Sequence, residues 1–387
     1  MIPYGRQSIS QEDIEYVLQV LQSNYLTQGP AVPRFEETVA AYCGATHALA
    51  TNSATAALHI ACLALGVGPG DWVWTSPTTF VASANCALYC GADIDFVDID
   101  PHTYNMSVAC LAHKLHQARQ EGRLPKVVIP VHLCGQSCDM EAIHALSREY
   151  GFHIIEDASH AIGGRYQGQP VGNCRFSDIT VFSFHPVKII TTGEGGMALT
   201  NDPELANLMR QYRSHGITNN RSEMLPRDSG EIWNYQQVRL GYNYRMTDIQ
   251  AALGLSQMER LDEFVRTRHN IAAIYDQALS SLPVTRPFQH SSTYSSYHLY
   301  PIRVSSQLSG KDQRTVYQQM HQAGILVNLH YIPVYRQPFF EKMGFRAGYC
   351  PEAEHYHRET LSLPMYPTLS AAQQQQVITV LQEVLSA

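Results

Sequence analysis

The chain of 387 residues has no stretch close to the roughly 18 consecutive apolar residues that a membrane helix needs. Residues 1–6 lack the apolar stretch of a secretory signal peptide. No run of five or six like charges occurs and the net charge is −7, so the basic face of a nucleic-acid-binding protein is not expected. These absences predict a cytoplasmic protein that acts on neither membranes nor nucleic acids.

The cysteines do not form a disulfide framework. Nine of them, an odd number, are scattered through a large chain, which is typical of reduced intracellular thiols. Cys86 and Cys90 are four residues apart, as are Cys134 and Cys138, but zinc modules use tighter pairs with flanking histidines. We expect buried thiols here and no metal.

Two phosphate-binding fingerprints are also missing. The chain contains neither G-x-G-x-x-G nor a Walker loop, which argues against a dehydrogenase or a nucleotidase. The composition, 44% hydrophobic and 16% charged, is that of an ordinary globular protein. The length predicts two or three domains and a sizeable core.

Between about residues 45 and 200, strand-like runs alternate with amphipathic helical patterns. The runs are 48–51, 71–75, 94–97, 127–131, 154–156, 179–184 and 197–200, and helical patterns include 54–65, 81–89 and 140–150. This alternation predicts an α/β fold whose sheet is mostly parallel and covered on both faces. Ligands of such sheets bind where the strands end.

The rest of the chain predicts a second, smaller domain. Residues 201–245 look irregular, and Thr247 with Gln250 forms a capping box that starts a helix over 248–282. Strand-like 297–304 and 326–329 and helical 312–323 and 371–385 follow. We expect a large domain over 1–247, and a linking helix with a small α+β domain over 248–387.

Lys188 is the first candidate for chemistry. It stands four residues after a β run that ends at Phe184, and glycines follow it. A lysine that is desolvated near a strand end can act as an amine nucleophile and form a Schiff base. A solvated surface lysine is the alternative, but lysines are few in this chain and this one lies in an apolar, glycine-rich setting.

Three other strand ends carry suitable side chains. Asp157 ends the apolar run 154–156 and is either a helix cap or a carboxylate for a ligand, with His160 close behind as a ligand contact or a core residue. Ser53 and Thr55 open a helix whose amides suit a phosphate, or simply cap it. Phe80 is either a core residue or an aromatic for ring stacking. Together with Lys188, these residues describe one site for pyridoxal phosphate, whose ring nitrogen needs an acid partner.

Five motifs in order carry a family resemblance. They are N-S-A-T-x-A-L, T-x-F-x-A-x-A-N, E-D-x-S-H-A, S-F-H-x-x-K-x-I-T-T-x-E-G-G and G-Y-N-Y-R-x-T-D-I-Q-A-A-L-G. From about residue 3 to the end, the chain resembles the DegT/DnrJ/EryC1/StrS sugar aminotransferases. The resemblance implies the aspartate-aminotransferase fold type I, in which a large domain with a mixed, mostly parallel sheet precedes a smaller α+β C-terminal domain.

The resemblance also implies roles for individual residues. Lys188 would hold the cofactor and shuttle the proton, Asp157 would pair with the pyridine nitrogen, and Phe80 would stack on the ring. Ala54, Thr55 and Ser183 would hold the phosphate beside Ser53, with Asn243 contributed by the neighbouring subunit of a homodimer. The residues expected around the cofactor or the sugar nucleotide are His160, Tyr4, Tyr25, Leu26, Thr27, His330 and Tyr331.

Within the family, several residues resemble the members that act in pseudaminic acid biosynthesis. These are the segment 25–29, His160 where many relatives carry glutamine, Ser183-Phe184-His185, and His330-Tyr331. Such an enzyme would move the amino group of L-glutamate to carbon 4 of a UDP-linked 4-keto-6-deoxy-N-acetylhexosamine. Lys188 would serve both half-reactions, in which L-glutamate gives up its amino group and the keto-sugar then receives it. This shared use predicts ping-pong kinetics.

Three alternatives stay open at this point. The substrate could be another UDP- or dTDP-keto-sugar, or the amino group could go to carbon 3 instead of carbon 4. An enzyme of either kind would have the same fold and lysine and would differ only in its pocket residues. A sugar dehydratase is disfavoured, because some of those enzymes replace the lysine with histidine and this chain keeps Lys188. A non-catalytic pyridoxal-binding regulator would usually carry an added DNA-binding segment, for which the family pattern leaves no room.

Overall fold

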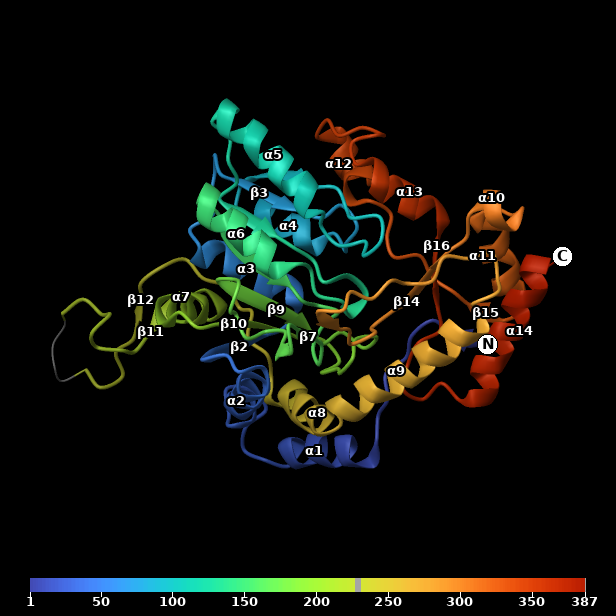
Figure 1. Cartoon of the computed structure of the whole chain (residues 1–387). Helices are drawn as coiled ribbons and strands as arrows, with labels where there is room; N and C mark the ends of the chain where they lie inside the picture. The colour runs from blue at the N-terminus through green and yellow to red at the C-terminus, as the bar shows by residue number, and fades with distance from the viewer. Residues whose placement is uncertain (227–230, 387) are drawn as a thin grey trace.

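A seven-stranded mixed sheet is the centre of the computed structural model, which describes residues 1–226 and 231–386 (Figure 1). The strands lie in the order β2 (His47–Thr51), β10 (Gly196–Thr200), β9 (Ile179–Ser183), β6 (His153–Asp157), β5 (Val127–Ile129), β3 (Trp72–Thr75) and β4 (Asp93–Phe96). β10 is antiparallel to both of its neighbours, and the other pairs are parallel. The predicted α/β fold with a mixed, mostly parallel sheet is confirmed.

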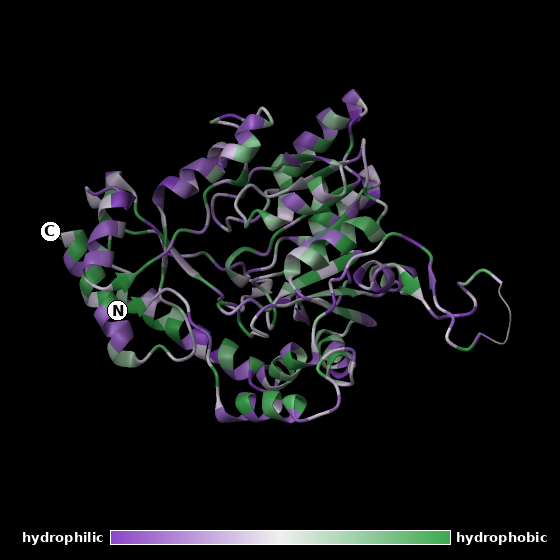
Figure 2. Ribbon diagram, turned by 180° about the vertical axis from the view of Figure 1, so that it is seen from behind, coloured by the Kyte–Doolittle hydropathy of each residue, from purple (hydrophilic) through white to green (hydrophobic). Residues whose placement is uncertain are grey.

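Helices cover both faces of this sheet because its strands are apolar on both sides. Val181 on β9 packs with helices α3 (Ala54–Ala64), α4 (Ala82–Tyr89) and α7 (Pro203–Arg213). Its neighbour Phe182 faces the opposite side, toward α2 (Ala31–Cys43) and α8 (Asp248–Glu259). Farther along that face lie α5 (Val108–Glu121) and α6 (Met140–Tyr150). Figure 2 shows hydrophobic residues gathered in the sheet and on the helix surfaces beside it.

Residues 201–245 are not irregular throughout, so that prediction was wrong. They begin with helix α7, whose N-cap Asp202 accepts hydrogen bonds from the amides of Glu204 and Leu205, with Pro203 in the first turn. This aspartate-proline start is a helix signal that outweighs the turn residues farther on. A short hairpin of β11 (Ile217–Thr218) and β12 (Gln236–Gln237) follows and projects from the body of the molecule (Figure 1).

The predicted linking helix is present, but in two segments. Thr247 and Gln250 form the expected capping box at the start of α8. The helix stops at Arg260, whose ψ of 4° is not helical, and α9 (Leu261–Ala278) continues from there. The apolar pattern continues across this break, so the sequence predicts one continuous helix.

The C-terminal part contains small sheets covered by helices. Strand β14 (Tyr300–Arg303) pairs with β16 (Thr360–Leu363), and β15 (Ile325–Leu326) pairs with the N-terminal β1 (Ile2–Pro3). The first residues therefore join the C-terminal part, and the division of domains at residue 247 stays a prediction. The helices of this part are α10 (Ser306–Ser309), α11 (Gln313–Gln322), α12 (Pro338–Lys342), α13 (Pro351–Glu359) and α14 (Ala371–Ser386).

A few further elements complete the described chain. They are α1 (Gln11–Leu21), the 3₁₀ turns η1 (Leu133–Gly135) and η2 (Val334–Arg336), and the strands β7 (Arg165–Tyr166), β8 (Gln169–Pro170) and β13 (Thr293–Tyr294). None of the helices described is long and apolar enough to cross a membrane. All nine cysteines are free, and the described residues contain no cluster of three metal-binding side chains.

The cap of α8 gives a direct test of the fold. Replacing Thr247 by alanine removes the side-chain acceptor of the Gln250 amide, so the free energy of unfolding should fall by about 1 kcal/mol. Ser305 is a matched control, because it precedes α10 without a side-chain capping bond. Urea denaturation of Thr247→Ala and Ser305→Ala compares the two, and equal midpoints would contradict the assigned cap.

Candidate active site

A cavity of about 890 Å³ lies at the edge of the sheet where the parallel strands end. Residues that follow β2, β3, β6 and β9 line it together with residues of the C-terminal part. Of the side chains predicted from the sequence, the lining includes Tyr4, Ser53, Ala54, Thr55, Phe80, Asp157, His160, Ser183, Lys188, His330 and Tyr331. Segments more than 300 residues apart in sequence therefore meet at one site.

The N-terminus of α3 forms one wall of the cavity. Ser53 caps the helix by accepting a hydrogen bond from the Ala56 amide at 3.1 Å. The first amides, at Ala54 and Thr55, come too early in the helix to have an intrahelical acceptor. A side chain at Gly196 would stand 2.4 Å from the Ala54 nitrogen, so glycine is required for β10 to pass this close. The exposed amides and the helix dipole suit a phosphate group.

Asp157 is held at the end of β6 by its backbone and by two donors. Its amide donates to the Pro130 carbonyl at 2.9 Å, and its carbonyl accepts from the His132 amide at 3.0 Å. The carboxylate accepts from the Ser83 hydroxyl at 2.6 Å and from the Ser159 amide at 3.1 Å. It is 4% exposed, and it keeps acceptor positions for a ligand in the cavity.

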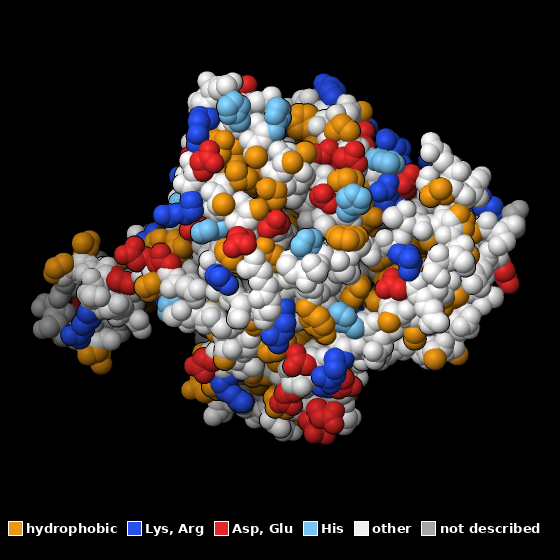
Figure 3. All heavy atoms as spheres, viewed as in Figure 1, with side chains coloured by type: hydrophobic (Ala, Val, Ile, Leu, Met, Phe, Trp, Pro, Cys, Tyr) orange, Lys and Arg blue, Asp and Glu red, His pale blue; other side chains and the backbone are white. Residues whose placement is uncertain are grey.

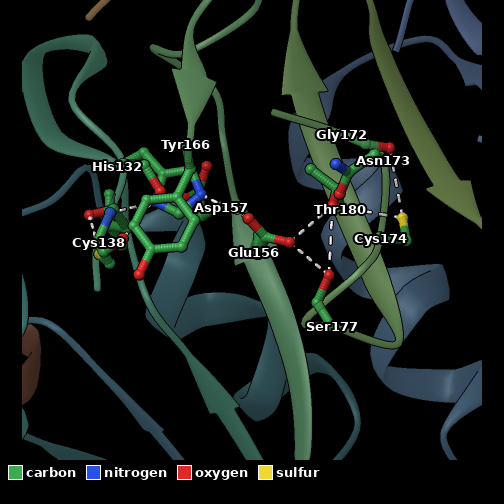
Figure 4. Close-up of polar contacts among 12 residues, drawn as sticks. His132, Cys138, Glu156, Asp157, Tyr166, Gly172, Asn173, Cys174, Ser177 and Thr180 are labelled. Carbon is green, nitrogen blue, oxygen red and sulfur yellow. Dashed lines mark hydrogen bonds and ion pairs between the residues drawn. The ribbon is translucent and has the colours of Figure 1, made fainter. Parts of the chain in front are cut away.

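Glu156, the other acid of the pair, faces the opposite side of the strand. Figure 4 shows its carboxylate pointing toward Ser177 and Thr180. Its second oxygen lies 2.7 Å from His132 Nε2. Because the Cys138 amide donates to His132 Nδ1, the proton of this imidazole is on Nε2 and is donated to Glu156. Strand alternation thus leaves Asp157 alone of the two at the cavity.

Lys188 follows β9 at a sharp bend of the chain. Its amide donates to the His185 carbonyl at 2.9 Å, and the segment returns to the sheet when the Thr192 amide donates to the Phe184 carbonyl. Burial lowers the pKa of the Lys188 amine to about 8, although the nearby Asp157 charge acts in the opposite direction. About a tenth of the amine is therefore neutral and nucleophilic at pH 7, a far larger fraction than for an ordinary lysine.

Phe80 presents an aromatic ring to the cavity and is not part of the core. It follows β3, and 60% of the residue is exposed. An exposed aromatic at a cavity wall offers a face for stacking on a flat ring.

Another part of the cavity wall is rich in imidazoles. Burial lowers the pKa of His330 to about 3 and that of His160 well below its usual value, with the Lys188 charge contributing to both. The sequence prediction missed His298, which is 3% exposed and whose ring centroid lies 4.3 Å from that of His160. No local motif marks His298, because only the folding of the C-terminal part brings it to the cavity.

Four predicted residues do not line the cavity of the single chain. Tyr25 and Leu26 are exposed, and Thr27 bridges to Thr247 near the start of α8. Asn243 is exposed as well, and its carbonyl accepts from the Asn52 side chain at 3.4 Å. Their roles stay predictions, and only that of Asn243 involves a neighbouring subunit.

Comparison with known proteins places this geometry in a family. The model of the DegT/DnrJ/EryC1/StrS aminotransferase family matches residues 7–382. The chain belongs to this family. It is therefore an aminotransferase of nucleotide sugars, its fold is that of the type I enzymes, and its cofactor is pyridoxal phosphate. The strand-end phosphate site, the carboxylate and the buried amine described above fit that cofactor.

Three curated relatives cover nearly the whole chain. The chain is 38% identical to the spore coat polysaccharide biosynthesis protein SpsC of Bacillus subtilis over 99% of its length and 97% of the relative's. It is 37% identical to the GDP-perosamine synthase of Caulobacter vibrioides (96% and 95%). It is 35% identical to the UDP-4-amino-4,6-dideoxy-N-acetyl-beta-L-altrosamine transaminase of Campylobacter jejuni (96% and 94%).

A solved structure shows the same fold. Helicobacter pylori PseC, an aminotransferase of pseudoaminic acid biosynthesis, superposes with a TM-score of 0.89 at 31% identity. The match covers 100% of this chain and 99% of PseC.

The lowered pKa of Lys188 predicts how cofactor attachment depends on pH. Only the neutral amine attacks the aldehyde, so attachment to the cofactor-free protein should quicken as pH rises and reach half its maximal rate near pH 8. Stopped-flow absorbance after mixing with pyridoxal phosphate measures this rate. A midpoint near 10.4, the value of an ordinary lysine, would contradict the desolvated site.

Proposed function

We propose that this enzyme moves the amino group of L-glutamate to carbon 4 of UDP-2-acetamido-2,6-dideoxy-β-L-arabino-hex-4-ulose, a step of pseudaminic acid biosynthesis in the cytoplasm. The observation that carries the aminotransferase chemistry is the Lys188 amine, with its lowered pKa, facing the same cavity as the Asp157 carboxylate. The likeness to PseC and to the Campylobacter jejuni transaminase supports the choice of sugar.

Each residue around the cofactor has a distinct task. Pyridoxal phosphate supplies an electron sink when its ring nitrogen is protonated. Asp157 would keep that proton in place by charge and hydrogen bonding, Phe80 would stack on the ring, and His160 would contact the cofactor from the cavity wall. Lys188 moves the proton between substrate carbon and cofactor, first for L-glutamate and then for the sugar. The phosphate is held by Ser53, Ala54, Thr55 and Ser183.

The sugar nucleotide takes the remaining space of the cavity. The volume of the whole cavity, about 890 Å³, lies toward the upper end of the range for small-molecule sites. Tyr4, His330 and Tyr331 line the cavity and offer polar contacts to the sugar. We assign Tyr25, Leu26 and Thr27 to the part of the substrate that extends beyond the cavity.

We propose a homodimer with shared sites, and the charges that the cavity lacks support it. No arginine among the described residues lines it, and Lys188 is its one lysine, yet a diphosphate and the carboxylates of L-glutamate need cations. Arg221 follows β11 and Arg239 follows β12 in the projecting hairpin, whereas Arg245 lies at the central sheet, where it bridges Thr51. Figure 3 shows hydrophobic side chains on this projection. The exposed ones include Leu225, Ile232, Trp233, Tyr235 and Leu240.

A second candidate substrate is a GDP-linked keto-sugar. The 37% identity to GDP-perosamine synthase favours it, since that relative is at least as similar as the transaminase of Campylobacter jejuni. The amino-transfer chemistry would be the same, and only the contacts to the base and the sugar would differ.

A panel of keto-sugars separates these substrates. Purified enzyme with L-glutamate should aminate the UDP-linked 4-keto-6-deoxy-N-acetylhexosamine at carbon 4, with a kcat/KM at least about 100-fold above that for GDP- and dTDP-4-keto-6-deoxy sugars, because each unpaired buried polar contact costs 1–3 kcal/mol. Mass spectrometry and NMR of the product measure rate and position. Lys188→Ala is the inactive control, and amination of the GDP-sugar alone would refute the pseudaminic assignment.

Subunit mixing tests the shared site. Lys188→Ala and Asn243→Asp subunits should each form poorly active homodimers, the second because its carboxylate repels the cofactor phosphate. If Asn243 acts across the interface, a heterodimer has one site with both changes and one unchanged site. Heterodimers isolated with two affinity tags should then recover about half of wild-type kcat. Recovery no better than that of the Asn243→Asp homodimer would place Asn243 in its own subunit's site.

A further inference from the structure

Tyr331 stands in the cavity wall between two buried histidines. Its ring lies 4.9 Å from the His330 ring and stacks at 27° on His160. Its hydroxyl oxygen is 3.2 Å from His160 Nε2. Burial raises the pKa of the Tyr331 phenol, so the hydroxyl keeps its proton.

The backbone fixes which nitrogen of His160 carries the proton. The Cys134 amide donates to His160 Nδ1 at 3.2 Å, and an amide nitrogen can only donate. Nδ1 must therefore be the unprotonated nitrogen, because the lowered pKa of His160 keeps the ring neutral. The proton of the imidazole is on Nε2, and Nε2 donates it to the Tyr331 oxygen.

This assignment sets the direction of the Tyr331 hydroxyl. Its oxygen already accepts from His160, so its own proton must point elsewhere. Among the described residues the hydroxyl has no other hydrogen-bond partner, and the residue lines the cavity. The Tyr331 proton is therefore free to be donated to a ligand in the cavity.

The backbone at Cys134 is strained in a way that serves this arrangement. Cys134 has φ of 60°, a left-handed conformation that is unfavourable for a non-glycine residue. The same residue aims its amide at His160. Strain of this kind persists where the surrounding structure enforces it, and it concentrates at functional sites.

We propose that Tyr331 donates a hydrogen bond to the reacting carbonyl oxygen of the keto substrate, and that His160 is the positioning residue that orients this hydroxyl. The inference rests on the amino-transfer function proposed above. It extends that function by assigning a group to the substrate oxygen, which Lys188 and Asp157 do not address.

The chemistry of amination needs such a donor. When nitrogen replaces a ketone oxygen, the carbon–oxygen double bond breaks and the oxygen leaves as water with two protons from the amine nitrogen. Negative charge builds up on the oxygen as nitrogen attacks, and a fixed donor stabilises that charge. Tyr331 ends the reaction with its own proton, so the balance needs no further reactant.

Replacing Tyr331 by phenylalanine tests the donor. The exchange of label between L-glutamate and 2-oxoglutarate passes through the same carbonyl chemistry without any sugar, and its kcat should fall about 100-fold. The visible spectrum of the bound cofactor should not change. Tyr89→Phe, on the exposed side of α4, is the matched control. An exchange rate equal to wild type would overturn the proposal.

Two substitutions of His160 test the positioning role. Glutamine can accept from the Cys134 amide and donate to Tyr331, so His160→Gln should stay within about threefold of wild type. His160→Leu can do neither, so the kcat of the exchange reaction should fall about as much as in Tyr331→Phe. The double variant with both His160→Leu and Tyr331→Phe should lose little more. Equal losses in His160→Gln and His160→Leu, or a fully additive double variant, would refute the relay.

Binding to the cofactor-free protein gives a readout apart from turnover. Measured by calorimetry, Tyr331→Phe should lower the affinity for the UDP-keto-sugar about fivefold. The affinity for the amino-sugar product should not change, since an ammonium group accepts no hydrogen bond. Equal weakening of both would contradict the assignment. If wild type exchanges label but aminates no sugar in the panel, the proposed substrate fails, and the Tyr331 result from the exchange reaction still decides this inference.

Discussion

The shared end point of parallel strands is the constraint on which the whole site depends. In the described sheet β10 alone runs the other way, so the segments after β2, β3, β6 and β9 reach one edge. The helix amides at Ala54, the ring of Phe80, the Asp157 carboxylate and the Lys188 amine meet there without any long connection. Parallel pairing thus assembles a cofactor site from four separate motifs.

Backbone pairing also controls how the charges are distributed. Adjacent residues of a strand face opposite sides, so the neighbours Glu156 and Asp157 cannot share a site. Glu156 is paired with His132 on the far side, which offsets the cost of burying its charge. Asp157 is left facing Lys188, and a buried amine beside a single carboxylate keeps a pKa low enough for chemistry near neutral pH.

Sequence patterns predicted the elements that have strong local signals. Every strand of the central sheet was predicted, because each is a short apolar run between turn residues, and the Thr247 cap was visible as a box of two residues. Helix α7 was missed although Asp202 and Pro203 mark its start. The break at Arg260 could not be predicted, since it interrupts no apolar pattern.

The site was predictable to a similar degree and for similar reasons. Lys188, Asp157 and Phe80 follow strand ends and could be found from the chain alone, whereas His298 reaches the cavity only through the packing of the C-terminal part. The direction of the hydrogen bonds from Cys134 through His160 to Tyr331 joins residues almost 200 positions apart, and no sequence spacing reveals it. Tyr25, Leu26, Thr27 and Asn243 do not line the cavity of the single chain, so their predicted roles are not tested by it.

The central claim is that pyridoxal phosphate is bound covalently at Lys188. Reduction of the holoenzyme with borohydride fixes the cofactor to its lysine, and peptide mass spectrometry then identifies the position. The chain has only five lysines, at positions 114, 126, 188, 311 and 342. We expect one pyridoxyl phosphate group per chain, on Lys188. Stoichiometric labelling of another lysine, or no labelling of a protein that is active, would contradict it.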